Sequence, residues 1–197
     1  ALRTLGTAEV MDNSWQVGDI PVRNWSVGSY ESLCVSLGGK KMRDTILVPH
    51  VACHYCSIGC SRWVKIETEA YKMDAPGPEY ETLGALGSMC LIDDLEAVSY
   101  AAHLCNIYGL DTISAGATVA FAVECFENGL ITKEDTDGVD LSWGNAEGAI
   151  AMLHKIAGRE GFGNLLAEGA LRAAREIGSG AEDAVTTHIK GMSQGTA

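Results

Sequence analysis

The sequence predicts a mainly α-helical fold with a cysteine-rich loop and a small extended region near the N-terminus. Apolar residues recur at spacings of three and four from residue 92 onward, the pattern of helices with one buried face. Residues 112–128 are apolar nearly all round, as in a buried helix. Apolar and polar residues alternate in the short segment RWVKIET, which predicts a strand.

The front of the chain carries few regular signals. Pro21 biases Ile20 away from a helix, so we expect GDIPVRNW to be an extended connection. Residues 30–48 predict a short helix that is broken at Gly38 and Gly39. After the strand, MDAPGPEYET contains two prolines and a glycine, and we expect a loop there.

The helices after residue 92 have start and stop signals of their own. Capping side chains precede them, and glycines that favour helix ends follow. The expected starts are Asp93 or Asp94, Thr112, the Thr132 to Asp135 segment, Asn145 and Asn164. The expected stops are Gly109, Gly129 and Gly178, the last of which closes one helix running from residue 164. VTTHIKG, near the end, is expected to be a strand or a loop.

The composition is that of a folded globular chain. Hydrophobic residues make up 47% and charged residues 20% of the 197 residues, which excludes a disordered chain. Lys and Arg total 14 against 26 Asp and Glu, a formal charge of -12, which argues against nucleic acid or an anionic membrane as a partner. No apolar run reaches the length of about 18 residues that a membrane span needs, and ALRTLGTAEV lacks the apolar core of a signal peptide.

The cysteines are the most informative residues. Their number is odd and no secretion signal is visible, so we expect a reducing, cytoplasmic setting and no disulfide framework. Cys105 and Cys125 lie in apolar helical stretches, which are typical of inert core cysteines. The seven cysteines are Cys34, Cys53, Cys56, Cys60, Cys90, Cys105 and Cys125.

Three of them, Cys53, Cys56 and Cys60, form a C-x2-C-x3-C run. Converging thiolates select zinc, Cu(I) or an iron–sulfur cluster. A cubane cluster needs a fourth cysteine, commonly a remote one, whereas His50 or His54 can complete a zinc tetrahedron. The closely spaced triplet favours the cluster over zinc, and cysteines without a metal are the third interpretation.

Two acidic residues and a histidine are candidates for proton transfer. Glu79 and Glu81 flank an aromatic residue in a segment rich in proline and glycine. They are either a solvated pair or a proton donor or acceptor near a reacting centre. His188 in THIKG is either structural or a functional imidazole.

The segment NIYGLDTIS joins two predicted helices. Its simplest interpretation is a helix–turn–helix in which Asp111 caps the second helix. The same geometry offers Asn and Asp side chains and free amides to a polar heterocycle or its phosphate.

Taken in order, these segments resemble the tungsten-containing aldehyde ferredoxin oxidoreductase family. The resemblance rests on GTA and PVRNW, ACHYCSIGCSR, GPEYETLGALGS, NIYGLDTISAG, FENGLITKEDTDG, LSWGNAEGAIAML, IAGREGFGNLLAEG and HIKGM. It covers nearly the whole chain, and the ordered set is specific although no single motif is. After Met192 the sequence SQGTA departs from the family pattern.

The resemblance implies a helical domain of the aldehyde ferredoxin oxidoreductase type. That domain would bind a [4Fe–4S] cluster and a bis-pterin carrying tungsten or molybdenum. The implied cluster ligands are Cys53, Cys56 and Cys60, with the fourth outside this chain. The implied pterin contacts are Asn106, Gly109, Leu110 and Asp111, which match one of two D-x-x-G-L-D/C motifs with Asn106 in place of the first Asp. The implied catalytic residues are Glu79 or Glu81 near the metal and His188 beside the active site.

The resemblance also implies that the chain is the central part of a longer enzyme. Residues 1–50 would be a linker that follows an N-terminal pterin-binding domain, and residues 51–197 an incomplete helical region that binds cluster and pterin. The enzyme would oxidise a small aldehyde to a carboxylic acid and pass electrons to ferredoxin or another carrier. We expect the fragment to be inactive alone, and a homodimer is an expected assembly.

Two alternatives remain open. Within the family, the chain would belong to a tungsten subunit that reduces an aromatic acyl-CoA. In another class, it would be a zinc-stapled helical interaction module without catalysis.

Overall fold

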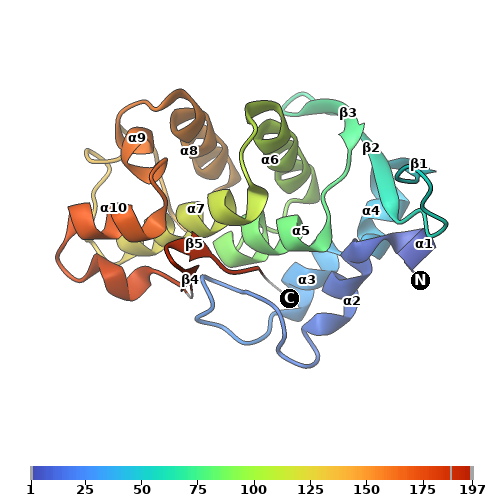
Figure 1. Ribbon diagram of the computed structural model, residues 1–197, viewed down its shortest axis with the longest axis horizontal. Coiled ribbons are helices and arrows are strands. Elements are labelled where there is room, and N and C mark those ends of the chain that lie inside the picture. The colour runs from blue at the N-terminus through green and yellow to red at the C-terminus, as the bar shows by residue number, and fades with distance from the viewer. Residues whose placement is uncertain (1, 187, 196–197) are drawn as a thin grey trace.

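The computed structural model describes residues 2–186 and 188–195, and helices dominate it (Figure 1). The predicted mainly α class is therefore confirmed. The elements are α1 (Leu2–Leu5), the 3-10 helix η1 (Thr7–Val10), α2 (Met11–Ser14), α3 (Glu31–Leu37), α4 (Gly39–Thr45), β1 (Leu47–Val51), β2 (Ser61–Glu67), β3 (Lys72–Pro76), α5 (Tyr80–Leu86), η2 (Ser88–Cys90), α6 (Leu95–Tyr108), α7 (Thr112–Glu127), α8 (Ala146–Gly158), α9 (Phe162–Leu166), α10 (Ala170–Ile177), η3 (Ala181–Ala184), β4 (His188–Ile189) and β5 (Met192–Ser193).

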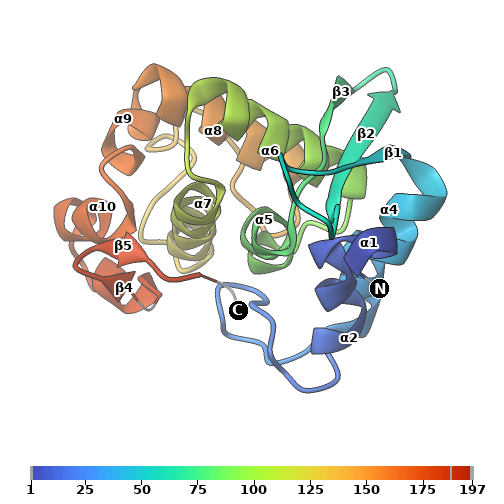
Figure 2. The ribbon, with the colours of Figure 1, turned by 45° about the vertical axis from the view of Figure 1, so that its right-hand side comes forward.

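Two packed helices, α5 and α7, form the centre of the molecule. They lie side by side in both ribbon views (Figure 1, Figure 2). Small residues allow the close approach, since a Cβ placed on Gly116 would lie 2.5 Å from the carbonyl carbon of Ala85. Most of α7 is buried, as its apolar composition predicts.

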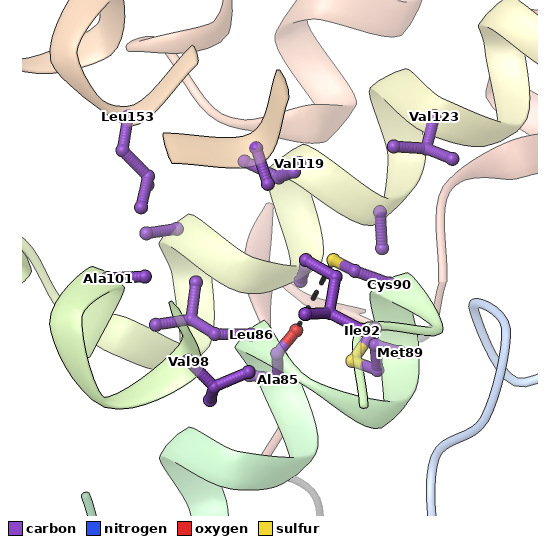
Figure 3. Close-up of a cluster of buried hydrophobic side chains, with 14 of the residues drawn as sticks. Ala85, Leu86, Met89, Cys90, Ile92, Val98, Ala101, Val119, Val123 and Leu153 are labelled. Carbon is purple, nitrogen blue, oxygen red and sulfur yellow. Dashed lines mark hydrogen bonds between the residues drawn. The ribbon is translucent and has the colours of Figure 1, made fainter. Parts of the chain in front are cut away.

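Helices α6, α8 and α10 pack against this pair. Figure 3 shows one such cluster, in which Leu86, Val98, Val119 and Leu153 come from α5, α6, α7 and α8. Cys90 belongs to the same cluster, and its Sγ lies 3.7 Å from the carbonyl oxygen of Ala85.

The helix caps form at the predicted side chains. Asp94 caps α6 by accepting hydrogen bonds from the amides of Glu96 and Ala97, and Gly109 ends that helix in the left-handed conformation. The Asn145 side chain accepts from the amide of Gly148 at the start of α8. These start and stop predictions are confirmed.

A three-stranded antiparallel sheet in the order β1-β2-β3 lies beside the helices. The predicted strand is β2, whose alternation places Arg62, Val64 and Ile66 on the buried face. Pro49 and Pro76 lie on β1 and β3, the two edge strands, where a proline removes no internal ladder bond.

The front of the chain packs into the main core. Residues 2–45 contain several short helices, including α3 and α4, which meet at the predicted break at Gly38 and Gly39. Met11, Leu37 and Met42 are fully buried in the main core. This segment is therefore part of the folded unit.

Three expectations about local structure are wrong. The segment MDAPGPEYET is not a loop, because its first half pairs with β2 as β3 and its end begins α5. The Thr132 to Asp135 cap forms, with Asp135 accepting from the Thr132 amide at 2.8 Å, but it closes a turn and no helix follows directly. The helix expected from residue 164 is split into α9 and α10, since Gly169 between them has a φ of +88°.

Among the residues that the structure describes, no single helix is long and apolar enough to cross a membrane. The helices α6 and α7 reach that length and composition only as a pair, with a bend of 119° between them.

Candidate functional site

The cysteine-rich loop connects β1 to β2. Its ends are held together, because Val51 and Ser61 are paired across the sheet. Inside the loop, the amide of Cys56 donates to the carbonyl of Cys53 at 2.9 Å, which turns the chain back on itself. Gly59, with a φ of +63°, makes a second sharp turn of the kind expected of a glycine there. The loop therefore brings its cysteines onto one short, folded segment.

The three cysteines of this loop differ from the other four in exposure. Cys53 is exposed, and Cys56 and Cys60 are half-buried. Hydrogen bonds from the amides of Gly59 and Ile58 lower the pKa of Cys56 and so favour its thiolate.

The remaining cysteines are buried, and burial raises the pKa of each thiol. The values are about 11 for Cys34 and Cys105 and about 12 for Cys90 and Cys125. Protonated, enclosed thiols are poor ligands and poor nucleophiles. The interpretation of Cys105 and Cys125 as core residues agrees with this environment.

The cysteine side chains do not converge on one point. Across residues 2–186 and 188–195, no three His, Cys, Asp or Glu side chains are close enough together to hold a metal ion. The donor chemistry nevertheless fits a soft metal or an iron–sulfur cluster, because three accessible thiols share the loop and amide donors already favour the Cys56 thiolate. Ligation would require rotation of these side chains.

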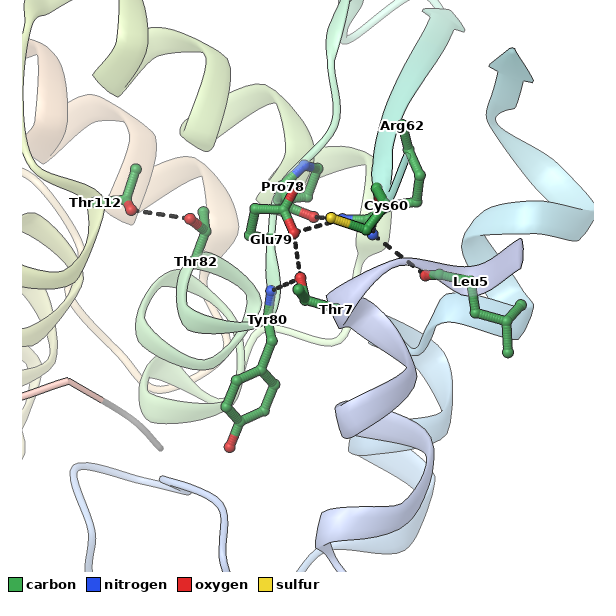
Figure 4. Close-up of polar contacts among 9 residues, drawn as sticks. All are labelled: Leu5, Thr7, Cys60, Arg62, Pro78, Glu79, Tyr80, Thr82 and Thr112. Atoms are coloured by element: carbon green, nitrogen blue, oxygen red, sulfur yellow. Dashed lines mark hydrogen bonds and ion pairs between the residues drawn. The ribbon is translucent and has the colours of Figure 1, made fainter. Parts of the chain in front are cut away.

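A buried arginine connects this loop to Glu79 (Figure 4). Arg62 is 1% exposed, and its Nη1 donates to the Cys60 carbonyl at 3.2 Å. Its Nη2 donates to the Pro78 carbonyl at 2.7 Å and lies 3.4 Å from Glu79 Oε2. Glu79, predicted as a candidate acid, is thus an ion-paired carboxylate at the N-terminal end of α5.

The N-terminal helices complete this network. Thr7 donates from its hydroxyl to the Glu79 carboxylate and accepts from the Tyr80 amide at 2.9 Å. Arg62 Nη1 also donates to the Leu5 carbonyl at 3.3 Å. Gly6 leaves room for the guanidinium, because a Cβ on Gly6 would overlap Arg62 Nη1.

The predicted pterin segment lies close to the first turn of α5. The hydroxyl oxygens of Thr82 and Thr112 are 2.9 Å apart, which joins α5 to the first residue of α7. Asp111 is the N-cap of α7, and its Oδ2 accepts from the Ser114 amide at 2.7 Å. Glu79 and Asp111, far apart in the sequence, therefore begin neighbouring helices.

The turn at residues 106–111 is open to a ligand. Asn106, Gly109 and Asp111 are exposed, and a pocket of about 110 Å³ begins beside Leu110. The pocket is lined by Leu110, Asp111, Ser114, Ala115, Thr118, Ile156, Leu166, Ala167 and Gly169. This volume is smaller than that of typical cofactor sites, so a bound pterin would extend beyond the pocket. The exposed amide and carboxylate oxygens fit the polar edge of such a ring.

His188 lies on a different element from the carboxylates. It belongs to the β4–β5 hairpin, is exposed, and accepts from the Gly191 amide at 3.2 Å through Nδ1. The chain then runs back to α5, where a Cβ on Gly195 would lie 3.4 Å from Glu81 Oε2. The hairpin also borders a groove of about 500 Å³ that shares Ser114 with the smaller pocket.

Sequence reasoning did not single out Arg62, Thr82 or Thr112. A signal for Arg62 was present, because it alternates with Val64 and Ile66 and so shares their buried face. A charged residue in such a position requires partners. The Thr82–Thr112 contact joins separate helices and has no signal in the local sequence.

The fold and the loop define a class: a mainly helical domain with three accessible thiols on one loop and a polar junction between two helices. The chain belongs to the aldehyde ferredoxin oxidoreductase family. The family profile described as "Aldehyde ferredoxin oxidoreductase, domains 2 & 3" matches residues 1–196. The resemblance predicted from the ordered motifs is confirmed.

Several relatives are similar over most of this chain. The tungsten-containing aldehyde ferredoxin oxidoreductase of Pyrococcus furiosus is 40% identical over 174 residues, 88% of this chain. The protein of the same name from Thermococcus kodakarensis is 37% identical over 174 residues, also 88% of the chain. The aliphatic sulfonate oxidoreductase, WOR-like subunit, of P. furiosus is 32% identical over 179 residues, 89% of the chain. The chain spans 28% of the length of each of these relatives.

A solved structure has the same fold. It is the active site complex BamBC of benzoyl coenzyme A reductase in complex with 1,5-dienoyl-CoA, with a TM-score of 0.78 and 27% identity. The match covers 96% of this chain and 28% of the other.

Proposed function

We propose that this chain forms the cluster- and pterin-contacting part of an enzyme that oxidises an aldehyde to a carboxylic acid. One observation carries the proposal: Arg62 contacts both the cysteine loop and Glu79, and α5, which begins after Glu79, meets α7 at Thr82 and Thr112. The names of the relatives, tungsten-containing aldehyde ferredoxin oxidoreductases, support the same reaction.

In this proposal, Cys53, Cys56 and Cys60 hold three corners of a [4Fe–4S] cluster, and the fourth ligand lies outside the chain. Asn106, Gly109, Leu110 and Asp111 contact the pterin. When bound, the tungsten–pterin centre and the cluster would supply two-electron chemistry and single-electron transfer to a ferredoxin, respectively.

The residues of this chain would manage the protons of the reaction. An aldehyde and water give a carboxylic acid, two protons and two electrons, so a base near the substrate is needed. Glu79, Glu81 and His188 are the candidates for that role, and Arg62 and Thr7 hold the Glu79 carboxylate in place. Glu79 would present its carboxylate from the N-terminal end of α5.

A domain division accompanies the proposal. Residues 51–197 would carry the ligands, and residues 1–50 would follow a pterin-binding domain and support the Arg62 network through Leu5 and Thr7. Because these residues supply only part of a pterin site, the isolated chain is expected to have no aldehyde oxidation activity.

The test is metal analysis of the full-length protein. We expect iron, acid-labile sulfide and tungsten, and Cys56→Ala should lower the iron content while the buried-site control Cys125→Ala leaves it unchanged. Zinc without iron or tungsten would favour the zinc-stapled interaction module and contradict the proposal.

A second candidate function rests on the structural similarity to the benzoyl coenzyme A reductase complex. The same residues would then serve a subunit that delivers electrons to an aromatic acyl-CoA. Reduction of a ferredoxin that depends on added aldehyde supports the oxidase, whereas oxidation of reduced ferredoxin that depends on an aromatic acyl-CoA supports the reductase.

A further inference from the structure

Arg62 occupies an unusual position for a charged residue. It has the largest side chain among those that are almost completely buried, and burial of an unpaired guanidinium would be strongly unfavourable. Its only acidic partner among the described ion pairs is Glu79, and its Nε is buried without a hydrogen-bond partner. The remaining guanidinium contacts are to backbone carbonyls, which cannot neutralise its charge.

The partners of Arg62 lie on two functional segments. On one side, Nη1 donates to the carbonyl of Cys60, the last cysteine of the loop. On the other side, Nη2 donates to the carbonyl of Pro78 and pairs with Glu79, at the start of α5 (Figure 4). Because the guanidinium is a rigid plane, a displacement at one side changes the geometry at the other.

We propose that Arg62 is a positioning residue that couples the Cys60 end of the cysteine loop to the Glu79 carboxylate. The functional importance of the cysteine loop and of Glu79 rests on the proposed function, but the coupling between them depends only on contacts within this chain. Rearrangement of the loop on ligation moves the Cys60 carbonyl, Arg62 follows, and Glu79 is re-aimed. The coupling is reciprocal, so the state of Glu79 also affects the loop.

The first experiment measures the coupling in the full-length protein without its cluster. The rate of alkylation of Cys60 is compared in Arg62→Gln, Glu79→Gln and the double variant. Each single change should increase the alkylation rate of Cys60. The rate increase in the double variant should be at least about threefold smaller than the product of the two single increases, since both changes break the same connection. The matched control is Lys65→Gln on the outward face of the same strand. Its effect on the alkylation rate should be independent of Glu79→Gln, so the effect of that double variant should equal the product of the two single effects.

Two variants keep the test informative if Arg62→Gln does not fold. Glu79→Gln leaves the guanidinium and its carbonyl contacts in place. Arg62→Lys keeps the charge but loses the planar fork, so it should not restore the coupling. Independent, multiplicative effects of the Arg62 and Glu79 changes, or full restoration by lysine, would overturn the proposal.

The second experiment measures the midpoint potential of the cluster in the loaded protein. Glu79→Gln should raise the potential, because the loss of a negative charge favours the reduced cluster, and it should raise it less when Arg62 is already Gln. If Arg62 were only structural, Arg62→Gln would change the cluster content, but Glu79→Gln would raise the potential equally with and without Arg62. That result would also overturn the proposal. If no iron is bound but the alkylation rates are coupled, the proposed function fails and the coupling through Arg62 stands.

Discussion

The hydroxyl groups of Thr82 and Thr112 lie 2.9 Å apart and join α5 to the first residue of α7. This contact fixes the distance between the helix that begins at the candidate carboxylates and the helix capped by Asp111. It also satisfies a hydroxyl that is largely removed from water, since Thr82 is 8% exposed.

Replacement of either threonine by valine tests the strength of this link. Thr82→Val and Thr112→Val should each lower the free energy of unfolding by about 1 kcal/mol, because each leaves a hydroxyl without its partner. The double variant should cost less than the sum. Urea denaturation provides the measurement, and Thr45→Val at an exposed site serves as the control. Fully additive losses would show that the two hydroxyls do not interact.

Gly6 is predicted to be indispensable for the Arg62 network. Gly6→Ala should lower the free energy of unfolding by at least about 3 kcal/mol, because its Cβ would overlap a buried guanidinium that cannot move into water. Gly129→Ala is the matched control, with a φ of +69° against +63° but no atom within 4 Å of its Cβ. That control should cost about 1 kcal/mol from backbone strain alone. Equal losses for the two variants would contradict the steric account.

Asp111 has a structural role and a proposed ligand role that can be separated. Asp111→Asn retains the cap of α7, whereas Asp111→Ala should lose about 1 kcal/mol of stability. In the full-length protein, Asp111→Asn should nevertheless lower the tungsten content, because the proposed pterin contact loses its charge. Asp94→Asn, at the cap of α6, is the control and should change neither quantity. Normal tungsten content in Asp111→Asn would contradict the proposed pterin contact and leave Asp111 only its role as the cap of α7.

Thiol labelling should divide the cysteines into two groups. At about pH 8, close to the ordinary thiol pKa of about 8.5, the loop thiols of the cluster-free protein should react readily with iodoacetamide. The buried thiols should remain unlabelled until the protein unfolds, because burial raises their pKa to about 11 or 12 and blocks the reagent. Peptide mass spectrometry identifies the labelled sites. Labelling of Cys90 at the rate of Cys53 would contradict the structure.

Asp137 should contribute a stability that depends on pH. Its Oδ2 accepts from the Phe162 amide at 2.9 Å and from Lys155 at 3.2 Å, and these contacts lower the pKa of Asp137. The contribution is complete above the ordinary aspartate pKa of about 4 and is lost as the pH falls toward the lower folded value. The difference in urea midpoint between the wild type and Asp137→Asn should therefore shrink on acidification.

A matched change separates the two partners of Asp137. Lys155→Gln removes the ion pair but leaves the amide of Phe162, which is the larger cause of the lowered pKa. It should therefore reduce the pH dependence less than Asp137→Asn does. A difference between wild type and Asp137→Asn that stays constant from pH 7 downward would refute this account.

Features encoded in neighbouring residues were predictable from the sequence. The caps at Asp94 and Asn145 and the buried helix α7 depend on side chains within a few residues of each other, so pattern reasoning found them. The three loop cysteines were likewise visible as a spacing, although their roles as ligands remain a prediction.

Features created by tertiary contacts were not predictable. The prolines of MDAPGPEYET suggested a loop, but the edge of β2 offered a partner that made its first half a strand. The Arg62 network draws on Leu5, Pro78 and Glu79, which no local pattern connects to Arg62. Gly169 has a positive φ only because the chain changes direction between α9 and α10, so one helical pattern became two helices.

The pairing of Val51 with Ser61 has a thermodynamic consequence for metal uptake. Because the sheet already holds both ends of the loop at residues 52–60, the entropy cost of closing that loop falls on folding and not on ligation. Ligation would then have to rearrange only the residues inside the loop. By linkage, a bound metal would in turn stabilise the pairing of β1 with β2. Changes that stabilise this pairing should therefore increase the affinity for metal.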